Sequence, residues 1–151
     1  MARPTKCRKV EFLPETTYFR PLKEGTSSLN KDGDNIEEVI LKVEELEAMR
    51  LKDIEGLTQQ ECADEMGISR QTFQNVIDNG RKKIAIALTE GRAINIKGGN
   101  YAFSFCEFKC KSCNQTYDIN YVKDKNICPS CNSKKVVCKR KNNKCRRWCG
   151  K

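Results

Sequence analysis

The pattern of apolar and polar positions predicts one strand and two helical stretches in the middle of the chain. Residues 38–41 are rich enough in β-branched side chains for a strand. Apolar residues then recur at helical spacing from about Val43 to Glu55, and Gly56 follows where a left-handed helix terminator belongs. Helical spacing resumes at Thr58 and continues, with one interruption, to about Leu88.

Less regular sequence flanks this helical region. Residues 7–18 alternate loosely, and residues 1–21 are expected to form a basic N-terminal arm or strand. Residues 22–35 are rich in Gly, Ser, Asn and Asp and predict a flexible loop. Gly91 can end the second helical stretch, and the alternation over residues 92–97 indicates a strand that pairs with the one at 38–41.

The second helical stretch has the register of a helix-turn-helix. Thr58 and Glu61 are spaced as a capping box, which satisfies backbone donors at a helix start. Gly67 supplies a turn residue that adopts positive φ at little cost, and Ser69 is a natural N-cap for the next helix. We therefore assign residues 36–97 to a helix-turn-helix DNA-binding domain whose second helix packs through Phe73, Val76 and Ile77.

This apolar stripe leaves polar side chains at the start of the second helix facing away from the core. A recognition helix presents its first turns to base edges, where Gln and Asn bond adenine and Arg bonds guanine. The candidates for base contacts are Arg70, Gln71, Thr72, Gln74 and Asn75, and those for phosphate contacts are Arg81, Lys82 and Lys83. The alternative is an ordinary helical hairpin with a polar outer face.

Two observations count against DNA binding. Residues 43–88 carry six basic and nine acidic residues, so only the second helix of the unit is cationic. Asn79-Gly80 also interrupts that helix, at a cost of about 1 kcal/mol relative to Ala for the interior Gly. The glycine either permits close packing or splits the helix.

Composition excludes several classes of function. With 38% apolar and 32% charged residues in 151, the chain cannot build a large core. It has no histidine, the commonest general base, and no motif that supports a reaction, so we expect no enzymatic activity. It shows no targeting signal and no apolar stretch of membrane-spanning length, which predicts a cytoplasmic protein without membrane association.

The net charge of +9 is concentrated at the C-terminal end. Residues 134–151 contain nine Lys or Arg and no acid, whereas the first 133 residues carry 20 basic and 20 acidic groups. Residues 1–10 add four basic residues and no acid, so both ends are cationic. Such ends suit a polyanion such as nucleic acid, and a solvated tail that aids solubility is the alternative.

Four segments of the sequence resemble a known family. The matching segments are Cys7-Arg8-Lys9-Val10, Tyr18-Phe19-Arg20-Pro21, residues 43–51 and residues 56–88. They are similar to the bacterial and archaeal family called domain of unknown function 134, over residues 1 to about 99. The resemblance implies a DNA-binding protein whose helix-turn-helix is similar to the fourth region of sigma factors.

Beyond an expected linker at 98–104, paired cysteines predict a metal site in a zinc-ribbon-like domain at 105–138. Cys110 and Cys113 form one CxxC knuckle, and Cys128 and Cys131 form another fourteen residues later. Two opposed knuckles can complete a tetrahedron of four thiolates around one ion. Zinc is the first expectation, iron in the same thiolates the second, and disulfides the third because the cytoplasm is reducing.

Four further cysteines lie nearby, and their spacing is less regular. Cys106 and Cys138 flank the knuckles, and Cys145 and Cys149 fall in a basic cysteine-containing tail at 139–151. They could form a second thiolate site, or the whole set could hold an iron–sulfur cluster. The alternative is free thiols in a loose tail.

These features together predict an α+β protein, mainly an α-helical helix-turn-helix domain followed by a small β zinc ribbon. The expected function is sequence-specific binding of double-stranded DNA in transcriptional regulation, with a structural four-cysteine metal site. Because such proteins often bind paired half-sites, a homodimer is a second expected partner. The alternatives are a metal- or redox-responsive regulator and an RNA- or protein-interaction module.

Overall fold

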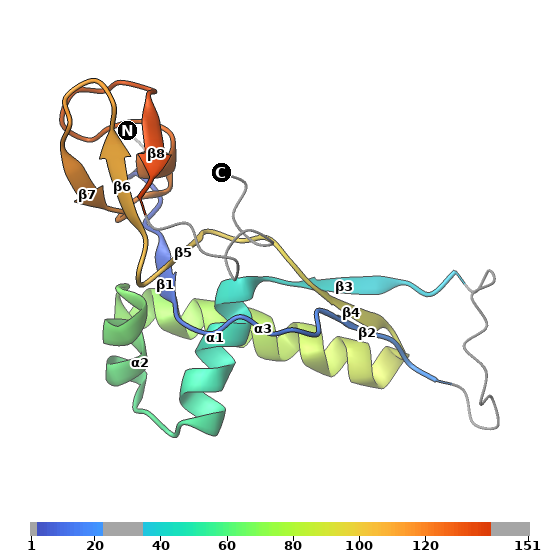
Figure 1. Cartoon of the computed structure of the whole chain (residues 1–151). Helices are drawn as coiled ribbons and strands as arrows, with labels where there is room; N and C mark the ends of the chain where they lie inside the picture. The colour runs from blue at the N-terminus through green and yellow to red at the C-terminus, as the bar shows by residue number, and fades with distance from the viewer. Residues whose placement is uncertain (1–2, 23–34, 140–151) are drawn as a thin grey trace.

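The computed structural model describes residues 3–22 and 35–139 and shows a mixed α+β fold. Three small β-sheets accompany three α-helices, as the sequence predicts for the fold class (Figure 1). The strands are β1 (Arg8–Val10), β2 (Tyr18–Phe19), β3 (Glu38–Leu41), β4 (Ala93–Ile96), β5 (Tyr101–Phe103), β6 (Glu107–Cys110), β7 (Thr116–Asp118) and β8 (Val136–Cys138). The helices are α1 (Val43–Met49), the π-helical turn η1 (Arg50–Ile54), α2 (Gln59–Met66), α3 (Arg70–Glu90) and the short 3₁₀ helix η2 (Val122–Lys125).

The predicted helix boundaries in the middle of the chain are confirmed. The helix expected from Val43 is α1, which continues through η1 as a π-helical turn and ends before Gly56 at φ 72°. Thr58 caps α2, because its hydroxyl accepts from the Glu61 amide at 3.2 Å and the Glu61 carboxylate accepts from the Thr58 amide at 2.8 Å. Gly67 has φ 66°, as its predicted role in the turn requires.

α3 is one continuous helix of 21 residues, so the interruption at Gly80 does not split it. The Ser69 hydroxyl caps its start by accepting from the Thr72 amide at 3.1 Å, and Gly91 ends it at φ 65°. Gly80 is buried against α1, which is the close-packing alternative of the two that the sequence left open.

The predicted pairing of residues 38–41 with 92–97 is also confirmed. β3 and β4 are parallel neighbours, and β2 adds an antiparallel strand on the other side of β4. The three strands lie along α3 (Figure 1). Leu41 and Ile96 are buried in a cluster that Ile84 of α3 also contacts, so one side of the sheet is covered by apolar packing.

The segment expected as a linker at 98–104 contains the strand β5. Its residues Tyr101, Ala102 and Phe103 are all buried, and they pair in parallel with β1. Gly98 and Gly99 precede this strand with φ of 73° and 114°, and a Cβ at Gly99 would overlap the Glu44 carboxylate. The apolar side chains at 101–103 pack against the N-terminal arm. Because β1 and β5 are 93 residues apart in the chain, no local sequence pattern indicates their pairing, and the segment was predicted as a linker.

The C-terminal part of the described chain is a three-stranded antiparallel sheet in the order β7-β6-β8. β7 pairs with one edge of β6 and β8 pairs with the other. Its core consists of Phe108, Ile119 and Val136 packed with buried cysteines. The sheet lies at one end of the molecule, near the N-terminal segment and beyond α2 (Figure 1).

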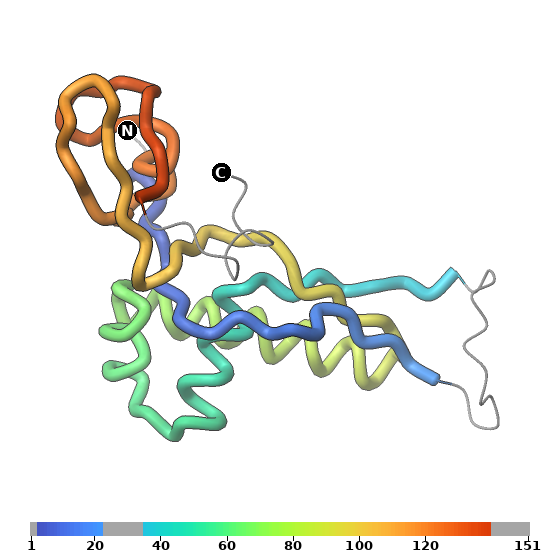
Figure 2. The backbone as a smooth tube through the Cα atoms, viewed as in Figure 1, coloured from blue at the N-terminus to red at the C-terminus, as the bar shows by residue number. Residues whose placement is uncertain are grey.

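The N-terminal segment joins the two parts of the molecule. It first runs beside the C-terminal sheet and then continues along the helices toward β2 (Figure 2). Backbone bonds from Cys7 to the Asn120 carbonyl and from Val122 to the Thr5 carbonyl attach it to the C-terminal sheet. Val10 is fully buried among α1, β3 and β5 residues, so this strand contacts both cores.

Most of the expected flexible loop, residues 23–34, lies outside the described residues, as does the basic tail from residue 140. Within the described part of the chain, no helix combines the length and apolar character needed to cross a membrane.

Candidate metal centre and nucleic-acid interface

The structure brings Cys110, Cys113, Cys128 and Cys131 together in one cluster. Their sulfur atoms all lie within 4.8 Å of one another, with 3.6 Å between Cys110 and Cys131 and 3.8 Å between Cys113 and Cys128. Cys110 and Cys128 are buried, and Cys113 and Cys131 are exposed. The four thiols therefore form a compact group with one side in the core and the other toward solvent.

The two knuckles share one backbone conformation. The amides of Cys110 and Cys128 each donate to the carbonyl five residues ahead, and the amides of Asn114 and Asn132 each donate back to the first cysteine. The two asparagines have φ of 60° and 59°, a left-handed conformation that Asn tolerates better than most residues. Each CxxCN sequence thus closes the same tight turn and presents two sulfurs on one side.

The surroundings shift the pKa values of two of these thiols in opposite directions. The backbone amide of Cys113 donates to the Cys110 sulfur and, with the Ser112 amide and two neighbouring thiols, lowers the pKa of Cys110 to about 6 against desolvation. The Ser133 amide lowers the pKa of Cys131, but desolvation and the three neighbouring cysteines outweigh it and raise that pKa to about 12. Four thiols at this spacing repel one another when ionised, and a bound cation removes that repulsion.

The cluster has the dimensions of a mononuclear thiolate site. Four thiolates around one zinc ion at about 2.3 Å define a tetrahedron with edges of about 3.8 Å. Two of the sulfur–sulfur separations, 3.6 and 3.8 Å, match that edge, and the others lie within 4.8 Å. In a [4Fe–4S] cluster each thiolate binds a different iron atom, and in a [2Fe–2S] cluster the two pairs of thiolates bind different irons, so either cluster separates some of the sulfurs further. The residues present therefore fit a single ion better than a cluster.

The expected second thiolate site is not assembled among the described residues. Cys106 and Cys138 both contact the core of the C-terminal sheet, but they belong to no group of three metal-binding side chains there. Cys145 and Cys149 lie outside the described residues. Cys7, which the sequence left unassigned, is 2% exposed in the same core, and desolvation raises its pKa.

Polar side chains at the start of α3 lie on the surface, as predicted. Arg70, Gln71 and Asn75 are exposed, and Gln74 is half-buried. Phe73 of the same turns is fully buried, so the helix separates a polar face from the core. Thr72 has a different role, because its hydroxyl and amide both bond Ser69 at the helix cap, at 2.9 and 3.1 Å.

Gln59 at the start of α2, which is not among the predicted site residues, contacts this polar face. Its carbonyl accepts from Arg70 Nε at 3.1 Å, and its amide nitrogen donates to the Gln74 carbonyl. Gln74 in turn donates to Asp78 at 2.8 Å. The spacing of residues 70, 74 and 78 at successive helical turns is the pattern in the sequence that predicts such a row.

The three cations expected to bind phosphates differ in their surroundings. Arg81 is half-exposed and forms an ion pair of 2.6 Å with Asp53. Lys83 turns toward α1, where its ammonium donates to both oxygens of the buried Glu45 at 2.8 and 2.9 Å. Lys82 is exposed and has no ion pair among the described residues.

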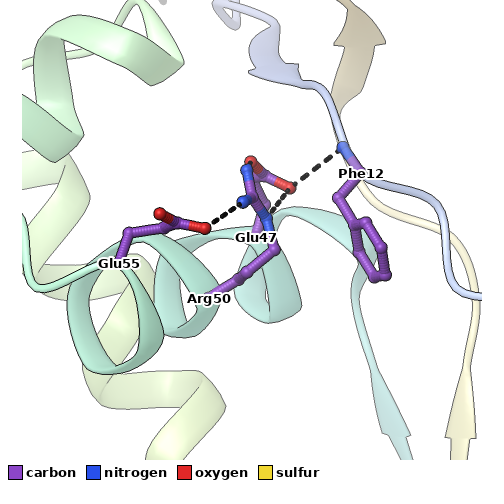
Figure 3. A network of polar contacts seen from close by, with 4 residues as sticks. All are labelled: Phe12, Glu47, Arg50 and Glu55. Atoms are coloured by element: carbon purple, nitrogen blue, oxygen red, sulfur yellow. Dashed lines mark hydrogen bonds and ion pairs between the residues drawn. The ribbon is translucent and has the colours of Figure 1, made fainter.

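A buried glutamate of α1 holds the N-terminal arm and η1 in place (Figure 3). Glu47 is 2% exposed; it accepts from Arg50 at 2.5 Å and from the Phe12 amide at 3.4 Å. The side-chain bond to Glu47 raises the pKa of Arg50, whose guanidinium also lies 5.6 Å from the centre of the Phe12 ring. This network fixes the outer side of α1, opposite the face that packs on α3.

Comparison with known proteins finds close relatives. A family model described as protein of unknown function DUF134 matches residues 1–104. A UPF0251 protein of Clostridium tetani is 58% identical over 149 residues, which covers 99% of this chain and 97% of the relative. A UPF0251 protein of Clostridium botulinum strain Hall is also 58% identical, over 99% of this chain and 90% of the relative. No solved structure matches the chain.

Proposed function

Taking as a premise that the chain belongs to the DUF134 family, which its first 104 residues match, we propose that it is a DNA-binding protein. α2, the turn at Gly67 and α3 act as a helix-turn-helix, and α3 enters the major groove of duplex DNA with its first turns. The protein binds a specific sequence and regulates transcription. It does so by binding rather than by catalysis, in the cytoplasm, and it binds paired half-sites as a homodimer.

One observation carries this proposal: the first two turns of α3 keep a polar face at the surface. Arg70, Gln71 and Asn75 are exposed there, while Phe73, Val76 and Ile77 are buried on the other side of the helix. Arg, Gln and Asn are the side chains that bond guanine and adenine edges bidentately in the major groove. A purely structural helical hairpin has no need for that set of side chains on its free face.

The turn before α3 supports the same proposal. A helix-turn-helix requires a short, fixed connection that sets the second helix at a steep angle to the first. Gly67 in left-handed conformation and the Ser69 cap provide that connection, and Ala63 and Met66 are fully buried between the helices. The position of α3 is therefore rigid, which is what base contacts demand.

We further propose that the four-cysteine cluster binds one zinc ion with a structural role. Its four sulfurs fit the tetrahedral spacing of a single ion, and zinc has no geometric preference that the cluster would oppose. When bound, the ion holds the two knuckles together. The chain's own residues set the geometry through the matched Asn114 and Asn132 turns.

The test compares wild type with the double variant Gln71→Ala, Gln74→Ala in gel-shift titrations. Wild type is expected to bind duplex DNA better than single-stranded RNA and to prefer a site selected from random duplexes. The double variant is expected to lose that preference but to retain weak non-specific binding, which comes from phosphate contacts. Equal loss on all duplexes contradicts the assignment of these residues, and a preference for RNA contradicts the function.

A second candidate function is metal- or redox-responsive regulation. It is favoured by β1, which connects the cysteine-rich sheet to the turn before α3. Cys7 belongs to the core of the C-terminal sheet, and two residues later the Lys9 side chain lies over Gly67, within 3.5 Å of where a Cβ would be. Disorder of the cysteine-rich sheet would reach the turn before α3 through this strand. Titrating one duplex with metal-loaded and chelator-treated protein separates a regulator, whose affinity changes, from a purely structural site.

A further inference from the structure

A row of four polar side chains crosses from α2 to α3 on the face proposed to contact DNA. Arg70 Nε donates to the Gln59 carbonyl at 3.1 Å, Gln59 Nε2 donates to the Gln74 carbonyl, and Gln74 Nε2 donates to Asp78 at 2.8 Å. Gln59 and Gln74 are half-buried, whereas the two ends of the row are exposed. The row therefore starts and ends in solvent, with both amides between.

The chemistry of the two ends fixes the direction of every hydrogen bond in the row. A guanidinium only donates, and a carboxylate only accepts. Because Arg70 only donates, Gln59 must turn its carbonyl toward Arg70 and its NH₂ toward Gln74. With Asp78 at the other end, Gln74 must turn its NH₂ along α3 and its carbonyl toward Gln59. A flip of either amide would place two donors or two acceptors face to face.

We propose that Gln59 is a positioning residue that fixes the amide orientation of Gln74 and thereby its base preference. This inference rests on the proposed function of α3. In an isolated glutamine on a helix surface, the amide rotates freely and can present either its oxygen or its nitrogen to a base. Here Gln59 holds the Gln74 oxygen on the side of α2, and Asp78 holds the nitrogen on the opposite side.

The bonding capacity that remains on Gln74 determines what it recognises. A carboxamide has two donor hydrogens and two acceptor lone pairs, and the row uses one of each. One N–H and one lone pair remain, in fixed order. That pair complements the N7 acceptor and the N6 donor that adenine presents side by side in the major groove. A fixed Gln74 therefore favours adenine over guanine, which offers two acceptors at those positions.

The row also lowers the cost of recognition. A side chain that is already held in its binding conformation loses less rotamer freedom when it contacts a base. Arg70, at the start of the row, is held by the same Gln59 carbonyl. One residue of α2 thus positions two candidate base-contacting side chains of α3.

The experiment measures base preference at each position of the site by selection from random duplexes, for wild type and four variants. Gln74→Ala identifies the position that Gln74 contacts, where adenine preference is lost. Gln59→Ala is expected to reduce adenine preference at that same position by about tenfold, while positions contacted by neither Gln74 nor Arg70 stay within about twofold. Gln59→Glu keeps the acceptor for Arg70 but cannot donate to Gln74, so it is expected to lose adenine preference at that position as well.

The matched control is Gln60→Ala, which removes a glutamine from the next position of α2. Gln60 is exposed, and its amide bonds Asp64 of its own helix at 2.9 Å. We expect its base preferences to equal those of wild type. Thermal unfolding of all variants, followed by circular dichroism, checks that each variant is folded. Base preference is a ratio between bases measured on one folded protein, so a partial loss of stability does not change it.

Three outcomes separate the inference from the proposed function. Unchanged adenine preference in Gln59→Ala, with loss in Gln74→Ala, overturns the positioning role and leaves DNA binding intact. Unchanged preference in Gln74→Ala overturns the inference because Gln74 then contacts no base. Failure of wild type to bind any duplex overturns the proposed function and the inference together.

Discussion

Gly80 of α3 lies so close to Glu45 of α1 that a Cβ at position 80 would meet the Glu45 Cβ at 3.1 Å. The Glu45 carbonyl is 3.4 Å from the same point, and the Glu45 carboxylate is held by Lys83 at 2.8 Å. The two helices therefore approach each other closely at this point. A glycine that looks like a helix breaker in the sequence is the contact point of the α1–α3 packing.

Gly80→Ala is expected to destabilise the protein by about 1 kcal/mol, although alanine is the better helix former. The added methyl group forces Glu45 away from Lys83, which offsets the gain in helix propensity. Urea unfolding measures the difference. Asn79→Ala, at the exposed neighbouring position, is the control and should stabilise slightly. A Gly80→Ala protein more stable than wild type would show that the helices can separate without cost.

Glu47→Gln is expected to lower the free energy of unfolding by about 3 kcal/mol. The change leaves Arg50, 18% exposed, without its 2.5 Å partner and weakens the bond that holds the Phe12 amide. Denaturant unfolding provides the value. Glu55 is the other ion-pair partner of Arg50, and its side chain is 52% exposed. Glu55→Gln should therefore change stability by less than about 1 kcal/mol. Equal effects of the two variants would contradict a structural role for the buried pair.

The capping box of α2 predicts a pH dependence. The backbone amide of Thr58, with its side chain, lowers the pKa of Glu61 below its ordinary value. Because the folded-state pKa is below the unfolded one, the contribution of Glu61 is fully present above the unfolded pKa and is lost as the pH falls through the folded pKa. An NMR titration of the Glu61 carboxylate should show the low pKa. Thr58→Ala removes the side-chain contribution but keeps the donating backbone amide, so it should raise the pKa only part of the way toward its ordinary value. An unchanged pKa in that variant would show that the Thr58 side chain does not contribute to the shift.

Purified protein is expected to bind one metal ion per chain at the four-cysteine cluster, and Cys128→Ser should abolish that stoichiometry. Removal of the ion by a chelator should lower the melting temperature, because structural thiolate sites contribute directly to folding. Elemental analysis gives the ratio, and a colourless protein identifies zinc rather than iron. Cys62→Ala changes a fully buried cysteine of α2 outside the cluster and should keep the metal. Retention of one metal by Cys128→Ser would contradict the assigned ligands.

Lys82 and Lys83 should behave differently in DNA binding, although they are neighbours. If α3 binds duplex DNA, Lys82→Ala should reduce the salt dependence of affinity by about one unit of slope, since an exposed lysine contributes one phosphate contact. Lys83→Ala should leave the slope unchanged and lower stability instead, because its ammonium is bound to Glu45. Affinity measured at several salt concentrations distinguishes the two, and equal slopes for both variants would contradict this division.

The parts of the fold that could be predicted from sequence are those that depend on neighbours in the chain. The Thr58 capping box, the Gly67 turn and the two CxxC knuckles each involve residues within five positions, and all have the predicted conformation. The pairing of β3 with β4 was also predictable, since residues 38–41 are rich in β-branched side chains and residues 92–97 alternate on the other side of the helices.

The parts that could not be predicted depend on distant segments. β5 looked like a linker because its partner β1 is about 90 residues earlier, and the Glu47 network joins α1 to an arm 35 residues away. For the candidate interface, the sequence identified the exposed side chains of α3 but not Gln59, which reaches Gln74 only because α2 crosses that helix. Equally, nothing near Lys83 in the sequence indicates that Glu45 holds it.

The attachment of the N-terminal segment to strands near the other end of the chain has a consequence for synthesis on the ribosome. Thr5 to Val10 emerge first, yet their backbone partners are residues 100–104 and 120–122. The helices between can form as they emerge, whereas the opening segment must wait until most of the chain has been translated. The opening segment is therefore fixed in place only by residues that are translated much later, and a product that stops at residue 104 keeps the partners of β1 but lacks Asn120 and Val122, which bond Cys7 and Thr5.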